Sequence, residues 1–317
     1  MSLKPLGVLL LILVAFTAHG EALTRDTDRL HLASVHAAVV DLDEGVMLYA
    51  KHADRPVPIA SVTKLMTALV VLESGADLDE SLTVIERDRE AANNAYSRIR
   101  PGSTMARGEL LRLALMSSEN RAAYNLAHYH PGGFDAFVAA MNRKAEALEM
   151  HRSRFVDPTG LSPGNRATAA DLIRLLTAAL ARDEIRDYTQ TGSYTARFGN
   201  PAYTLPYGNT NPLVRRADWD VLVSKTGYLD EAGRCLATVV RVDGRRYGVV
   251  VLNAFGKLTP IGDVGRIRRW LVEGEGGRVA GPALAYERRR TAPLEADLPR
   301  VVRMPSDGDT ATAALTR

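Results

Sequence analysis

The stretch PIASVTKLMTALVVLE, residues 58–73, joins a nearly continuous apolar helix pattern to one serine and one lysine at its start. A helix that is apolar almost all round is buried within a domain. Ser61 and Lys64 are three positions apart, so a helix places their side chains on one face, about 5–6 Å from each other. Burial lowers the pKa of a lysine, and a neutral lysine can take the proton of a serine. The stretch therefore predicts a buried helix that carries a nucleophile, Ser61, and its base, Lys64.

This spacing is not specific when it is taken alone. A serine followed three residues later by a lysine occurs by chance about once in a chain of this composition. The alternative interpretation is a serine that caps a helix, with a lysine on the surface.

Strand patterns occupy both ends of the folded part. Apolar runs over residues 33–42 and 46–50 flank a short loop that ends in Gly45, which predicts a hairpin. Runs over residues 235–242 and 247–252 flank Asp243-Gly244 and predict a second hairpin, preceded by a short run at 221–224.

Helix patterns fill the region between these strands. They cover residues 61–73, 108–116, 122–128, 134–148 and 169–181. Thr168 and Asp171 form a variant capping box for the last of them. The chain therefore predicts a sheet assembled from both ends, a helical lobe beside it, and a cleft where the two meet.

Ser118-Glu119-Asn120 separates two of the predicted helices. A hydroxyl and an amide two residues apart in such a break can project together into a cleft. There Ser118 would relay a proton and Asn120 would bind a substrate carbonyl. Ordinary helix capping by serine and asparagine is the alternative.

Lys225-Thr226-Gly227 follows the apolar run at 221–224. Gly227 would let a ligand backbone lie close against a sheet edge, Lys225 would supply positive charge for a carboxylate, and Thr226 would donate a hydroxyl. The alternative is an ordinary passage from strand to turn, although a given tripeptide is expected only about 0.1 times in such a chain.

Composition excludes several classes of protein. With 317 residues, 46% hydrophobic and 24% charged, the chain is neither disordered nor collagen-like and suits one large domain or two small ones. A net charge of +3 does not indicate a nucleic-acid binder. One cysteine, Cys235, allows no intramolecular disulfide and no cysteine zinc site, and its apolar strand pattern predicts a buried residue.

The two ends differ in composition from the rest of the chain. Residues 1–20 have the charge, apolar run and small residues of a signal peptide cleaved after Gly20, and their apolar run is too short to span a bilayer. Residues 275–317 lack sustained apolar periodicity and are expected to form a disordered tail. The folded domain is then expected to cover residues 21–274.

The three motifs each occur once, in the order Ser-x-x-Lys, Ser-x-Asn and Lys-Thr-Gly, a set shared by class A β-lactamases and penicillin-binding proteins. The chain resembles the low-molecular-mass penicillin-binding proteins, serine D-alanyl-D-alanine endopeptidases and carboxypeptidases, and most closely the periplasmic endopeptidase branch. The stretches that carry the resemblance over most of 33–274 include PIASVTKLMTALVVLE (58–73), YSRIR (96–100), LALMSSENRAA (113–123), YTLPYGNTNPLV (203–214) and SKTGYLDEAGRCLA (224–237).

The resemblance implies an α+β fold of the β-lactamase/transpeptidase type, with a five-stranded antiparallel sheet flanked by helices and a helical lobe. It implies that Ser61 is acylated, that Lys64 activates it, and that Ser118 shuttles protons to the leaving group. Carried over in the same way, Asn120 orients the peptide and Lys225 with Thr226 holds a carbonyl or carboxylate. The oxyanion hole would be the backbone N–H groups of Ser61 and Tyr228. The role of Glu119 is open.

The expected function is that of a periplasmic serine endopeptidase that cuts D-alanyl cross-links in peptidoglycan, needs neither metal nor cofactor, and is trapped by β-lactams. No nucleic acid, and no membrane anchor after signal cleavage, is expected, and the sequence identifies no partner hydrolase. The alternatives are a D-alanyl-D-alanine carboxypeptidase, a non-catalytic penicillin-sensing wall protein and a β-lactamase, although residues 155–165 lack the glutamate that class A enzymes use. A metallopeptidase built on His128 and His130 is a weaker alternative.

Overall fold

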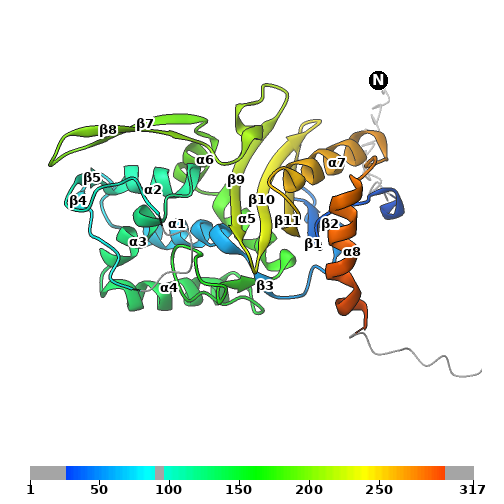
Figure 1. The fold of residues 1–317 in the computed structure, drawn as a ribbon, viewed down its shortest axis with the longest axis horizontal. Coiled ribbons are helices and arrows are strands. Elements are labelled where there is room, and N and C mark those ends of the chain that lie inside the picture. The colour runs from blue at the N-terminus through cyan, green and yellow to red at the C-terminus, as the bar shows by residue number, and fades with distance from the viewer. Residues whose placement is uncertain (1–25, 90–95, 297–317) are drawn as a thin grey trace, which may run out of the picture.

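A computed structural model describes residues 26–89 and 96–296 (Figure 1). The predicted signal peptide, residues 1–20, lies outside the described residues. None of the described helices has the length and apolar character that a membrane span needs.

A five-stranded antiparallel sheet is built from both ends of the described chain, as the sequence predicts. Its order is β2-β1-β11-β10-β9. The strands are β1 (His36–Asp41), β2 (Val46–Lys51), β9 (Asp220–Leu229), β10 (Gly233–Val242) and β11 (Arg245–Ala254). Gly45 and Gly244 adopt left-handed backbone angles in the two predicted hairpin turns, with φ of 72° and 81°. The central pairing of β1 with β11 joins strands that are about 200 positions apart in the sequence.

Both faces of the sheet are covered, which explains the unbroken apolar runs. Along β1, Ala38 and Val40 pack with the helical lobe, whereas Ala37 and Val39 pack with α7 (Thr259–Glu273). Side chains alternate between the two faces of a strand, so a strand that is covered on both sides is apolar throughout. Every residue of β1 is therefore buried.

The predicted helices are confirmed, with small changes at their ends. The lobe contains α1 (Lys64–Glu73), α2 (Arg107–Met116), α3 (Asn120–His128), α4 (Gly133–Ala147), α5 (Ala169–Leu180) and α6 (Asp183–Gln190). A short 3₁₀ helix, η2 (Ala60–Thr63), precedes α1 and carries Ser61. The predicted cap is present, since the Thr168 hydroxyl accepts from the Asp171 backbone N–H at 2.9 Å.

Several elements were not anticipated from the sequence. They are α6, α7, the 3₁₀ helices η1 (Thr27–Arg29) and η3 (Pro212–Arg215), and the paired strands β3 (Val57–Pro58) with β6 (Arg166–Ala167), β4 (Ser81–Thr83) with β5 (Thr104–Ala106), and β7 (Ser193–Phe198) with β8 (Tyr203–Gly208). Figure 1 shows the β7–β8 hairpin extending over the lobe, away from the sheet.

The expectation of a disordered tail from residue 275 is wrong for α8 (Gly281–Ala296), which lies beside the sheet (Figure 1). Polar contacts anchor this helix. Glu287 pairs with Lys51 at 2.8 Å, and the Tyr286 hydroxyl donates to Asn253 Oδ1 at 2.7 Å. The helix has almost no apolar stripe, so a search for apolar periodicity does not find it. Residues 297–317 lie outside the described part of the chain.

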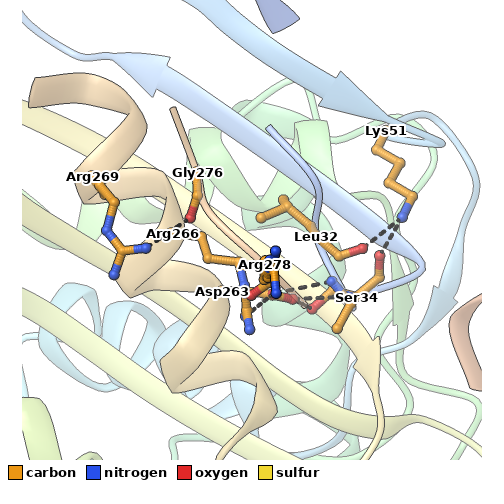
Figure 2. A network of polar contacts seen from close by, with 9 residues as sticks. Leu32, Ser34, Lys51, Asp263, Arg266, Arg269, Gly276 and Arg278 are labelled. Carbon is orange, nitrogen blue, oxygen red and sulfur yellow. Dashed lines mark hydrogen bonds and ion pairs between the residues drawn. The ribbon is translucent and has the colours of Figure 1, made fainter. Parts of the chain in front are cut away.

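A buried carboxylate ties the start of the described chain to α7 (Figure 2). Asp263 is fully buried and accepts hydrogen bonds from the Ala33 N–H at 3.0 Å, the Ser34 N–H at 2.8 Å and the Ser34 hydroxyl at 2.6 Å. Its charge is balanced by Arg266, whose Nη1 lies 2.9 Å away. The segment before β1 is therefore held against α7 by this side chain, together with Trp270, whose indole N–H donates to the Asp26 carbonyl at 2.9 Å.

We expect Asp263→Ala to lower the free energy of unfolding by about 3 kcal/mol, because it leaves two buried N–H groups and a guanidinium without their acceptor. Urea denaturation measures the change. The matched control is Asp135→Ala, which removes a carboxylate that is 83% exposed. Equal stability of the two variants would contradict the role given to Asp263.

Candidate active site

The backbone around Ser61 is packed closely between β9 and the loop of residues 155–165. A Cβ atom added to Gly227 on β9 would lie 2.9 Å from the Ile59 carbonyl oxygen and 3.0 Å from the Ser61 nitrogen. A Cβ atom added to Gly160, whose φ is +79°, would lie 2.1 Å from the Ala60 carbonyl oxygen. Glycine at these two positions is what allows both segments to contact the Ser61 backbone.

Lys64 contacts the candidate nucleophile from a fully buried position. Its Nζ lies 2.9 Å from Ser61 Oγ, 2.7 Å from Asn120 Oδ1 and 2.5 Å from the Thr159 carbonyl oxygen. Burial lowers the pKa of Lys64 to about 7, even though the nearby charges of Asp157 and Glu119 act to raise it. Near neutral pH a large fraction of this amine is uncharged, and an uncharged amine at that distance can accept the Ser61 proton.

Ser118 and Lys225 form a second pair. Ser118 lies in the break between α2 and α3, with a left-handed φ of 62° that is uncommon for serine. Its hydroxyl accepts from Lys225 Nζ at 2.9 Å, and Lys225 also donates to the Thr226 carbonyl at 2.8 Å. Burial, reinforced by the charge of Lys64, lowers the pKa of Lys225 well below its usual value. The predicted helix break is confirmed, and it directs a hydroxyl toward the strand.

The structure brings all the predicted side chains to one junction between the sheet and the lobe. The residues come from η2, α1, the α2–α3 break, the start of α3, and β9: Ser61, Lys64, Ser118, Asn120, Lys225, Thr226 and Gly227. The Thr226 hydroxyl donates to the Thr210 hydroxyl at 2.7 Å. The contribution of the Ser61 and Tyr228 N–H groups to an oxyanion hole stays a prediction.

A cavity of about 600 Å³ opens over Ser61, Ser118, Thr226 and Gly227 and is cationic. Arg215, Arg234 and Lys257 line it, and no acidic residue does within the described part of the chain. The Arg234 guanidinium lies 3.7 Å from the centre of the Tyr228 ring. Both side chains line the cavity.

The loop of residues 155–165 contributes the Thr159 backbone carbonyl to the site. The Asp157 carboxylate, which the sequence analysis did not identify, holds this loop in shape. Asp157 accepts from the backbone N–H groups of Thr159, Gly160 and Ser162 at 2.7–2.9 Å, and its Oδ2 accepts from Asn165 Nδ2 at 3.0 Å. These bonds hold the Thr159 carbonyl against Lys64. An aspartate that precedes Pro-Thr-Gly is a turn signal that could have revealed this arrangement.

The described residues offer no ligand cluster for the metallopeptidase alternative. His128 and His130 each lie edge-on to an aromatic ring, and no cluster of three or more His, Cys, Asp or Glu residues suitable for a metal occurs within 26–89 and 96–296. Cys235 is buried, as expected, and burial raises the pKa of its thiol to about 12.

Comparison with known proteins adds independent information. A family model described as D-alanyl-D-alanine carboxypeptidase, peptidase S11, matches residues 22–256. The chain is 44% identical to a D-alanyl-D-alanine endopeptidase of Escherichia coli K12 over 84% of this chain and 86% of that protein. It is 46% identical to a D-alanyl-D-alanine endopeptidase of Pseudomonas aeruginosa over 82% of this chain and 84% of the relative.

Solved structures give the same result for the fold. The Streptomyces K15 DD-transpeptidase aligns with a TM-score of 0.70 at 26% identity, covering 76% of this chain and 98% of that one. Penicillin-binding protein D2 of Listeria monocytogenes, in an ampicillin-bound form, aligns with a TM-score of 0.65 at 28% identity, covering 75% and 96%. The expected fold class is confirmed.

The lowered pKa of Lys64 predicts a pH-dependent stability. Between about pH 7 and 10 the unfolded lysine holds a proton that the folded one has lost, so the free energy of unfolding rises with pH by up to about 1.4 kcal/mol per pH unit. Lys64→Met removes this contribution and should flatten the slope measured by urea denaturation. The control is Lys144→Met, which removes a lysine paired with Glu73 outside the site. Equal slopes for Lys64→Met and the wild type would contradict the assignment.

Proposed function

The chain belongs to the peptidase S11 family of D-alanyl-D-alanine carboxypeptidases, and on that basis we propose that it is a serine endopeptidase that hydrolyses D-alanyl cross-links in peptidoglycan. The observation that carries the proposal is the 2.9 Å approach of Lys64 Nζ to Ser61 Oγ, at the edge of an open cavity, with a lysine whose pKa is about 7. A serine that is paired with a partly neutral base can form an acyl-enzyme.

Acylation uses the two hydroxyl–lysine pairs in turn. As Ser61 Oγ bonds to the carbonyl carbon of the D-alanyl residue, Lys64 Nζ takes its proton. The carbon–nitrogen bond then breaks, and the Ser118 hydroxyl, which accepts from Lys225, donates a proton to the departing amine. The proton that Lys64 took from Ser61 then restores the Ser118 hydroxyl, which leaves Lys64 neutral again. In the second half of the reaction Lys64 takes a proton from the water that attacks the ester carbonyl and passes it to Ser61 Oγ as the ester bond breaks, which releases the peptide as a carboxylic acid.

The remaining residues orient the substrate. Asn120 Oδ1 accepts from Lys64, so its amide nitrogen is the group that would donate to a substrate carbonyl. Lys225 and Thr226 provide charge and a hydroxyl for a carbonyl or carboxylate beside β9. The backbone N–H groups of Ser61 and Tyr228 would stabilise the oxyanion, a contribution of several kcal/mol in acyl transfer generally.

Two observations bear on the alternatives. The relatives at 44% and 46% identity are both named endopeptidases, which favours cross-link cleavage over removal of a terminal D-alanine. The carboxylate of Asp157 is fully engaged inside its own loop, so it is poorly placed to activate water as a β-lactamase requires. A β-lactam should therefore acylate Ser61 and remain bound.

We further propose that the protein acts in the periplasm after removal of residues 1–20. The signal-peptide pattern of these residues supports the proposal, as does a substrate that lies outside the cytoplasmic membrane.

Ser61→Ala should abolish covalent labelling by a fluorescent penicillin and lower cleavage of cross-linked muropeptide dimers by at least about 1,000-fold, because the attacking atom is gone. Chromatography of the products measures cleavage. Ser117→Ala is the control, since the Ser117 hydroxyl donates to the Leu113 carbonyl outside the site. Loss of terminal D-alanine from monomers, with dimers left intact, would replace the endopeptidase assignment by a carboxypeptidase one.

The rate of acylation by a penicillin should rise with pH and level off above about pH 7, because only the neutral form of Lys64 accepts the serine proton. At about pH 6 the rate should be roughly tenfold below the plateau, from the fraction of neutral amine. Stopped-flow labelling across the range measures the profile. A flat profile, or full activity of Lys64→Arg, would exclude Lys64 as the base.

A further inference from the structure

A groove adjoins the active-site cavity. It has a volume of about 780 Å³ and lies between η3 and α7. Pro212, Leu258 and Ile261 line both the groove and the cavity, so the two form one continuous depression. Most of the groove residues lie beyond residue 256, where the family match ends.

The groove is strongly cationic. Two carboxylates line it, those of Asp218 and Glu273, against five arginines: Arg216, Arg266, Arg268, Arg269 and Arg278. The adjoining cavity adds three cations and no carboxylate from the described residues. Together the two hollows present a path of positive charge that starts at Ser61.

The arginines of the groove are held in place but are not neutralised one for one. Asp218 receives two of them, Arg216 through a bidentate pair at 2.9–3.0 Å and Arg268 at 3.7 Å. Arg268 also lies 4.9 Å from the centre of the Trp219 ring, which orients its guanidinium. Arg269 donates to a neutral carbonyl, that of Gly276, at 3.4 Å.

The far end of the groove is built on the Asp263 cluster. Arg266 is bound to Asp263 and is only 17% exposed, and Figure 2 shows Arg278 beside that pair. This part of the wall is therefore rigid. Arg216 and Arg268, whose side chains are 57% and 39% exposed, present accessible guanidinium groups, and Arg269 and Arg278 are exposed as well.

We propose that this groove binds the carboxylates of the second stem peptide of a cross-linked substrate, the part that does not fit in the cavity over Ser61. The inference rests on the proposed function. A cross-link joins two peptides that both carry free carboxylates, and arginine forks bind carboxylates in a bidentate manner. A substrate with one peptide would fill the cavity alone, whereas a cross-linked one would also fill the groove.

The test compares a large substrate with a small one in the full chain. In the double variant Arg216→Gln/Arg268→Gln, the KM for cross-linked dimers should rise about tenfold. Acylation by a fluorescent penicillin, which reaches only the cavity, should stay within about twofold of the wild type. Arg174→Gln, which removes an exposed arginine on α5, is the matched control.

Asp218→Asn separates charge from structural damage, because it breaks the same ion pairs but makes the groove more positive. It should lower the KM for dimers, the opposite of the arginine variant, and added salt should reduce both effects.

Each outcome decides the proposal. Equal changes in dimer cleavage and in acylation would overturn it, as would a KM that none of the variants alters. If the double arginine variant loses binding to anionic lipid vesicles while its cleavage of dimers is unchanged, the groove would instead be assigned to a membrane surface. A wild-type protein that labels with penicillin but cleaves no dimers would refute the proposed function rather than the groove.

Discussion

The site depends on one costly arrangement, the burial of the Lys64 amine among neutral oxygens. Its three partners are a hydroxyl, an amide oxygen and a backbone carbonyl. A charged ammonium group in such surroundings is destabilised, so the amine sheds its proton near neutral pH. The same burial that destabilises the charged form of Lys64 allows its neutral amine to act as a base. The aspartate turn at residue 157 supplies the carbonyl partner, and the well-packed α1 excludes water.

The sheet serves this arrangement by bringing a second lysine to the same point. β9 is an edge strand, and Gly227 lets it approach the Ser61 backbone more closely than any other residue would allow. Lys225 then reaches Ser118 across the junction. Burial lowers the pKa of Lys225, and the nearby charge of Lys64 lowers it further. One hydroxyl–amine pair serves the attacking oxygen and the other serves the leaving group.

Elements at the end of the described chain extend the molecule around this centre. Helix α7 buries one face of the sheet through residues such as Trp270, while its outer side forms the arginine groove. Helix α8 is attached mainly by polar contacts, including the largely buried pair of Lys51 and Glu287. The surface around Ser61 is consequently cationic over a larger area than the catalytic step requires, which suits a substrate with several carboxylates.

The sequence by itself determined the elements that repeat a local pattern: the hairpins, the buried α1, the capped α5 and the three motifs with their serines and lysines. These follow from apolar periodicity and from short spacings, which act over a few residues. Tertiary structure alone decided what depends on distant partners: the Thr159 carbonyl on Lys64, the lowered pKa values and the arginine groove. It also decided that α8 forms, because this helix is held partly by the ion pair of Glu287 with Lys51, some 240 residues earlier, and such a contact leaves no apolar periodicity in the sequence. Burial and charge at these sites are properties of the assembled chain.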